Sequence, residues 1–121
     1  MVIQKCTDIE VYNMSFKSAM NIFNVTRQFP HEEKFSLIDQ IRRSSRSVPV
    51  NIREGFAKRR YPYVFVRHLN DALGSSEETM AWLDFAFQCL YLPESTYRQF
   101  CLDYRFIGAK LYKLMNSWQK F

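Results

Sequence analysis

Apolar residues recur at intervals of three and four along almost the whole of this 121-residue chain, and this spacing constrains the fold more than any other feature. At 3.6 residues per turn, it places the apolar side chains on one face of an α-helix. Proline or a polar cluster interrupts the pattern at three places, so it predicts four helices. Because short loops make long neighbouring helices antiparallel, we expect one all-α domain over residues 1–121, an up-down-up-down four-helix bundle.

The interruptions also predict the ends of the helices. The expected boundaries are Thr7 to Phe29-Pro30, Glu32 or Glu33 to about Lys58, Tyr61-Pro62 to Leu92, and Pro93-Glu94 onwards. Glu10 stands three residues after Thr7, as in a capping box. Pro49 should bend the second helix, because proline has no backbone N–H to donate.

Two of the predicted apolar faces bear on the later argument. In the first helix the face comprises Ile9, Tyr12, Phe16, Ala19 and Phe23. In the second helix it comprises Leu37, Ile41, Val48, Ile52 and Phe56. We expect both faces to point into the bundle core.

Composition excludes several classes of protein. With 47% hydrophobic and 17% aromatic residues, the chain is too apolar for a disordered tail. Three glycines and four prolines are too few for the turns of a β-sandwich. Three cysteines without a CxxC pair indicate neither a disulfide framework nor a zinc site, so we expect no metal or cofactor. Without a run of about 20 apolar residues or a signal peptide, a cytoplasmic location is expected, away from membranes.

The third helix contains features that its apolar face does not explain. Gly74 costs up to about 1 kcal/mol relative to alanine inside a helix. We expect the close approach of another helix there, with a backbone surface for a ligand as the alternative. Trp82, Phe85 and Cys89 lie partly off the core face, which indicates a subunit interface.

The second helix concentrates the positive charge of the chain. From Gln40 to Arg60 there are seven cations and one carboxylate, whereas the rest of the chain has ten cations and eleven carboxylates. On a regular helix, the side chains of Arg42, Arg46, Arg53 and Arg60 fall within an arc of roughly 40°. Guanidinium groups bind phosphate in bidentate fashion, and Tyr61 and Tyr63 could stack on unpaired bases. The predicted nucleic-acid-binding residues are Arg42, Arg43, Arg46, Arg53, Lys58, Arg59, Arg60 and Arg67. The alternatives are a solvated face or pairing with acidic residues of another helix or subunit.

A polar stripe runs between the arginines and the apolar face, at spacings of three and four. Its members are Gln40, Ser44, Ser47, Asn51, Glu54 and Lys58. The favoured interpretation is hydrogen bonding across a seam between two helices. The alternative is a recognition groove in which Asn51 and Glu54 contact a ligand.

The same segment carries a family signature, Phe29-Pro30-x-x-Glu33, Leu37-x-x-Gln40-Ile41-Arg42-Arg43 and Ser47-Val48-Pro49-x-Asn51-Ile52-x-Glu54-Gly55. The signature closely resembles that of bacterial four-helix bundle proteins, first recognised in intervening sequences of large-subunit ribosomal RNA genes. Phe65-x-x-x-Leu69-Asn70-x-Ala72-x-Gly74-Ser75-x-x-Glu78-Thr79 is similar to the third-helix pattern of that family. The resemblance covers essentially the whole chain. The positions that match the signature are Glu33, Gln40, Arg42, Arg43, Ser47, Pro49, Asn51, Glu54 and Gly55.

The resemblance implies a left-handed bundle that assembles as a ring, commonly a homopentamer, without established catalytic activity. Nucleic-acid binding is the usual proposal for this family. Related accessory proteins of diversity-generating retroelements look like basic rings that work with a reverse transcriptase and its RNA. This chain departs from the family at Arg46 and Arg53, where small or aliphatic residues are usual.

The sequence therefore favours a non-enzymatic, self-associating protein that binds RNA or DNA. The alternative is a scaffold, or an accessory subunit of a reverse transcriptase, whose arginines meet an acidic protein. An enzyme is disfavoured, because catalysis needs a positioned acid or base. His31 and His68 are the only histidines, neither follows an arginine after four to six residues, and no Glu-x-x-His metal motif occurs.

Overall fold

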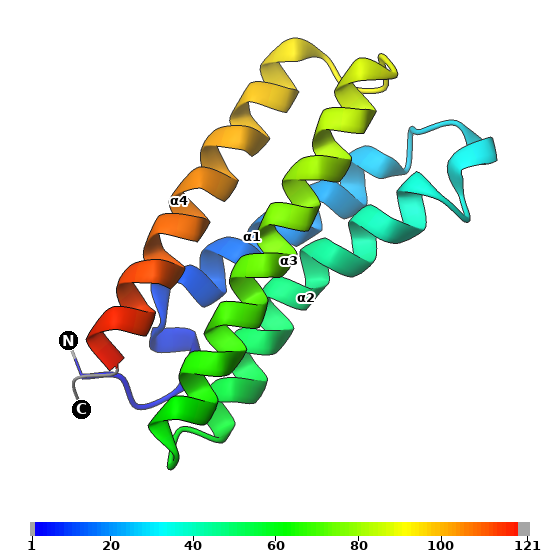
Figure 1. Ribbon diagram of the computed structural model, residues 1–121. Helices are drawn as coiled ribbons and strands as arrows, with labels where there is room; N and C mark the ends of the chain where they lie inside the picture. Colours follow the sequence, from blue (N-terminus) through cyan, green and yellow to red (C-terminus); the bar gives the residue numbers. More distant parts are fainter. Residues whose placement is uncertain (1, 119–121) are drawn as a thin grey trace.

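The computed structural model describes residues 2–118, and in these residues four long helices pack side by side (Figure 1). The helices are α1 (Glu10–Thr26), α2 (Leu37–Ala57), α3 (Pro62–Gln88) and α4 (Glu94–Trp118). Each helix packs against its neighbour in the sequence, and α1 also contacts α4. The chain reverses direction at every loop in Figure 1, so the predicted up-down-up-down bundle is confirmed.

Two predicted helix starts are wrong because short 3-10 turns occupy those positions. Cys6–Asp8 forms one such turn, so α1 begins at Glu10, and the carboxylate of Asp8 accepts the backbone N–H groups of Gln4 and Lys5. Glu10 completes no capping box. It instead pairs with Lys110 of α4 at 3.0 Å.

The second turn comprises His31–Glu33, and α2 therefore begins at Leu37 rather than at Glu32 or Glu33. The carboxylate of Glu33 accepts hydrogen bonds from the Ser36 hydroxyl and from the backbone N–H of Leu37, at the start of α2. A carboxylate at this position satisfies a donor of the first helical turn and interacts favourably with the helix dipole. The predicted start of α3 is confirmed, with Pro62 in the first turn.

Pro49 lies inside α2 and is buried. The N-terminal half of α2 runs obliquely to α3, and the C-terminal half runs alongside it (Figure 1). This change of direction is the one that a proline within a helix predicts.

The core is built from the apolar faces of all four helices. Every residue of the predicted α2 face is buried. At one end of the bundle, the rings of Phe56, Phe65 and Trp118 meet edge to face, with 4.7 Å between the centroids of Phe65 and Trp118. Phe16 of the predicted α1 face is an exception, because 52% of it is exposed. None of the helices described is both long and apolar enough to cross a membrane.

A candidate nucleic-acid interface on the second helix

The arginine face of α2 lies against the aromatic residues of α1. The guanidinium carbon of Arg42 lies 4.7 Å from the ring centroid of Phe23, and that of Arg46 lies 5.7 Å from the same centroid. One end of the face repeats this arrangement, with Arg53 5.8 Å from the ring centroid of Tyr12. Cations are attracted to the faces of aromatic rings at such distances.

Arg42 is held against α1 more firmly than the other arginines. Its Nε donates to the hydroxyl of Thr26 at 2.9 Å, and an Nη donates to the carbonyl of Phe23 at 3.4 Å. Burial, together with the positive charges of Arg46 and Arg27, lowers the pKa of the Arg42 guanidinium. Arg42 therefore attaches α2 to the last turn of α1, which restricts its access to a phosphate.

Arg46 and Arg53 are exposed. Arg53 donates to the Tyr12 hydroxyl at 3.2 Å, and this hydrogen bond raises the pKa of Arg53. Within residues 2–118, neither side chain forms an ion pair with a carboxylate. The structure thus brings together Arg42, Arg46 and Arg53 as predicted, but against aromatic rings of α1.

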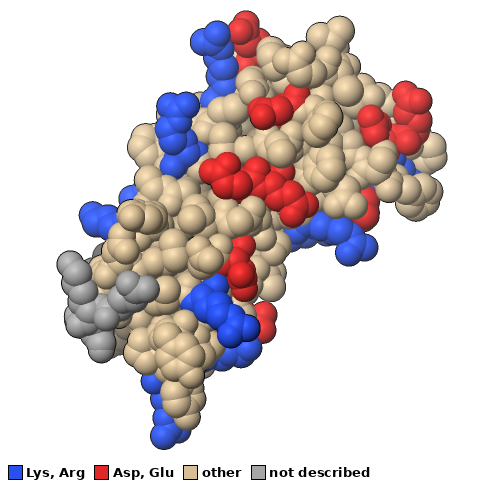
Figure 2. All heavy atoms as spheres, viewed as in Figure 1, with Lys and Arg blue, Asp and Glu red and all other residues tan. Residues whose placement is uncertain are grey.

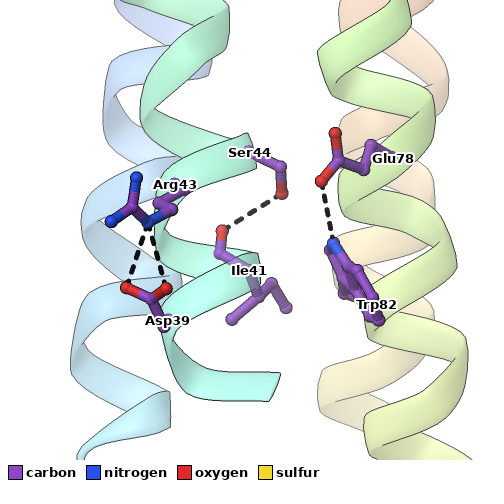
Figure 3. A network of polar contacts seen from close by, with 6 residues as sticks. All are labelled: Asp39, Ile41, Arg43, Ser44, Glu78 and Trp82. Carbon is purple, nitrogen blue, oxygen red and sulfur yellow. Dashed lines mark hydrogen bonds and ion pairs between the residues drawn. The ribbon is translucent and has the colours of Figure 1, made fainter. Parts of the chain in front are cut away.

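Two other predicted cations form exposed ion pairs along α2. Arg43 binds Asp39 through its Nε at 3.0 Å, on the side of α2 away from α3 (Figure 3). Lys58 binds Glu54 at 3.2 Å. Exposed pairs one helical turn apart contribute only about 0.3–0.5 kcal/mol, so a phosphate could compete for either cation.

The remaining predicted cations gather at the turn between α2 and α3. We call this surface the basic tip, and it comprises Lys58, Arg59, Arg60, Tyr61, Tyr63 and Arg67. Because α2 ends at Ala57, Arg60 belongs to the basic tip and not to the arginine face, which corrects the sequence-based prediction. Basic side chains surround this end of the molecule at the bottom of Figure 2.

Charge and aromatic surface are combined at the basic tip. Tyr61 is 55% exposed and Tyr63 is 71% exposed. Arg59 lies over the ring of Phe56 at 3.9 Å and donates to its carbonyl, whereas Arg60 lies 5.9 Å from the ring centroid of Tyr61. In the part of the chain described, Arg59, Arg60 and Arg67 have no carboxylate partner.

The polar stripe of α2 forms a seam with α3, which confirms the favoured interpretation. Its contacts are Ser44 with Thr79 at 2.9 Å, Ser47 with Ser75 at 2.9 Å, and Asn51 with His68 at 3.3 Å. The Asn51 amide also donates to the Ser47 carbonyl at 2.9 Å. Figure 3 shows Ser44 on the α3 side of α2. Gln40 and Glu54, at either end of the stripe, are exposed.

Gly55 explains why α2 and α3 can approach so closely. A Cβ atom on Gly55 would lie 2.5 Å from the Cβ of His68 and 3.0 Å from a ring carbon of Phe65. By contrast, a Cβ on Gly74 would meet nothing within 4 Å. The close approach predicted at Gly74 is therefore absent from the described chain, and it occurs at Gly55 instead.

The sequence-based prediction missed the aromatic partners of the arginines. Tyr12 and Phe23 are eleven residues apart on α1, and Arg42 and Arg53 are eleven residues apart on α2. Antiparallel helices bring two such equal spacings together as matched pairs, so this signal was present in the sequence. It also missed Tyr91, whose hydroxyl donates to Glu33 at 2.9 Å across the two loops at the other end of the bundle.

A groove between α1 and α2 was also missed, because Phe16 was assigned to the core. We call it the α1–α2 groove, and its volume is about 470 Å³. Its lining comprises Tyr12, Phe16, Ala19, Met20, Arg46, Pro49, Val50, Arg53 and Glu54. Elsewhere, no group of three or more metal-ligating side chains comes together in the residues described.

This bundle can now be compared with known proteins. A family model described as the 23S rRNA-intervening sequence protein matches residues 7–113. The chain belongs to this family. Among solved structures, this member of the 23S rRNA-intervening sequence protein family is similar to a protein of unknown function from the S23 ribosomal protein family of Bacteroides thetaiotaomicron. The two chains are 29% identical, the match covers 88% of this chain and 95% of the other, and the TM-score is 0.79. No curated protein matches the chain.

Proposed function

We propose that this protein is a non-enzymatic RNA-binding protein whose basic tip contacts phosphates. The observation that carries the proposal is the group Arg59, Arg60 and Arg67, exposed beside Tyr61 and Tyr63 and unpaired with any described carboxylate. Guanidinium groups bind the backbone phosphates, and tyrosine rings stack on unpaired bases. Single-stranded RNA or the loops of structured RNA fit this combination better than a regular duplex does.

The proposal includes self-association, as a ring and most simply as a homopentamer. A single basic tip offers only a few phosphate contacts. Repeating the tip by symmetry raises the effective concentration of the remaining tips once one of them is bound. The free cysteines Cys6, Cys89 and Cys101 fit the reducing cytoplasm, where we place this activity.

A fluorescence anisotropy titration with a labelled RNA hairpin tests the proposed function. Arg60→Gln/Arg67→Gln removes two cations of the basic tip, and Lys17→Gln/Lys113→Gln removes two exposed cations elsewhere. We expect the tip variant to bind at least tenfold more weakly and to have a salt slope lower by up to about 2, because each lost phosphate contact removes about 0.9. The control variant should stay within about twofold of the wild type. Absence of binding at low salt, or equal losses in both variants, would overturn the proposal.

A further inference from the structure

The α1–α2 groove is an apolar surface that the described chain leaves uncovered. Phe16, Met20 and Val50 are 52%, 46% and 59% exposed, although all three line the groove. Large apolar side chains that gather on a surface mark an interaction site. The exposed guanidinium groups of Arg46 and Arg53 border the apolar lining, so an occupant must combine apolar and acidic groups.

The outer surface of α3 offers that combination. We call it the α3 ridge, and it comprises Asp71, Gly74, Glu78, Ala81, Trp82 and Phe85. Phe85 is 59% exposed and packs beside Trp82, with 5.7 Å between their ring centroids. The indole N–H of Trp82 donates to the Glu78 carboxylate at 3.0 Å (Figure 3).

The charge of this surface is opposite to that of the groove. Residues 69–97 contain five carboxylates and neither lysine nor arginine. In Figure 2, acidic side chains form a band across the face that α3 and α4 occupy in Figure 1. Complementary charge steers two surfaces together and suppresses other pairings.

Gly74 adds an independent observation on the α3 ridge. Glycine inside a helix costs up to about 1 kcal/mol relative to alanine. Gly55 has a steric reason to be glycine, whereas no atom of the described chain approaches the position of a Cβ on Gly74. A helix from a second copy that packs on the α3 ridge would supply the missing reason.

We propose that the α3 ridge of one copy docks into the α1–α2 groove of a second copy. Phe85 and Trp82 cover the apolar lining, and Glu78 and its acidic neighbours face Arg46 and Arg53. This inference rests on the self-association in the proposed function and names its contact, but it does not depend on RNA.

The two surfaces lie on different helices, so the contact joins unlike faces of the two copies. Such a contact builds a closed ring when its rotation closes. It also divides the cations between two roles. Arg46 and Arg53 are covered by the neighbouring copy, whereas the basic tip at the α2–α3 turn stays exposed for phosphate.

Light scattering coupled to size exclusion, on nuclease-treated protein, tests the contact. The groove variant is Arg46→Glu/Arg53→Glu, the ridge variant is Phe85→Lys, and the charge-matched control is Lys17→Glu/Lys113→Glu. We expect the wild type and the control to form the same assembly. Each interface variant should fall to the protomer mass of 14.5 kDa, with the helical circular dichroism unchanged.

Mixing the two interface variants gives the sharpest result. Each variant retains the surface that the other has lost, so we expect a one-to-one complex of twice the protomer mass that grows no further. An unchanged assembly in either variant, or a mixture that stays at the protomer mass, would overturn the docking contact and leave the RNA proposal standing. A monomeric wild type would overturn self-association itself, even if an acidic peptide then bound the groove.

Discussion

Gly55 and Gly74 show how one residue type serves different purposes in one bundle. Gly55 lies where a Cβ would overlap the Cβ of His68, whereas Gly74 lies in open space. The sequence gives no means of telling them apart, because both glycines stand in amphipathic helices near polar residues. Only the relative placement of α2 and α3 decides which glycine is sterically required.

Alanine at these two positions should therefore have opposite effects on stability. Gly55→Ala forces α2 and α3 apart and should lower the free energy of unfolding by about 1–3 kcal/mol. Gly74→Ala should raise it by up to about 1 kcal/mol, because alanine is the better helix former. Urea unfolding in the Arg46→Glu/Arg53→Glu background measures both effects without a contribution from assembly. Effects of the same sign would contradict the steric account.

Glu33 should make stability depend on pH in the acid range. Hydrogen bonds from Ser36 and Tyr91 lower the pKa of Glu33 in the folded protein. A lowered folded pKa stabilises the fold above the unfolded pKa, and this contribution is lost as the pH falls through the folded value. We expect Glu33→Gln to be less stable than the wild type at pH 7, with the difference shrinking towards pH 3. The comparison uses urea midpoints across the pH range, and a constant difference would rule out this role.

At the scale of the element, α2 is the helix that the sequence describes best and the one whose ends it describes worst. Its three faces follow from residue spacing alone, because a regular helix fixes the angle between any two side chains. Its first residue was wrong because Glu33 accepts the backbone N–H of Leu37 and separates the preceding turn from the helix. Periodicity also does not encode which neighbour each face meets, so Phe23 and Tyr12 were not predicted as partners of the arginines.

The seam between α2 and α3 should show coupling between the hydroxyls of Ser44 and Thr79. Both residues are buried, and the Thr79 hydroxyl lies 2.9 Å from that of Ser44. We expect Thr79→Val to cost roughly 1–3 kcal/mol, because it removes a buried hydrogen-bonding partner. Ser44→Ala/Thr79→Val should cost less than the sum of the two single changes, since neither variant hydroxyl is left behind. Strict additivity in a double-mutant cycle would show that the contact contributes nothing.

At the scale of the molecule, the separation of charge is more informative than the net charge of +5. The sequence located the basic segment, but it did not divide it into a face against α1 and a tip at the α2–α3 turn. That division depends on where α2 ends and on which rings α1 presents. The acidic surface of α3 passed unnoticed, because carboxylates scattered among apolar residues look like an ordinary solvated face.

Assembly and RNA binding should be linked through salt. If several basic tips contact one RNA, the wild type releases more counterions than an isolated protomer does. We therefore expect the slope of log affinity against log salt to be steeper for the wild type than for Phe85→Lys, which leaves the basic tip intact. Anisotropy titrations from 50 to 200 mM salt measure both slopes. Equal slopes would show that each copy binds RNA independently.

The hydroxyls and amides shared by α2 and α3 have a consequence for how the chain selects its native state. Sliding α3 by one turn would part Ser47 from Ser75 and Asn51 from His68, and it would drive Gly55 away from its only permissive neighbour. Each displaced alignment would strand several polar groups without water. Groups that add little net strength therefore exclude the misaligned bundles that an all-leucine seam would tolerate.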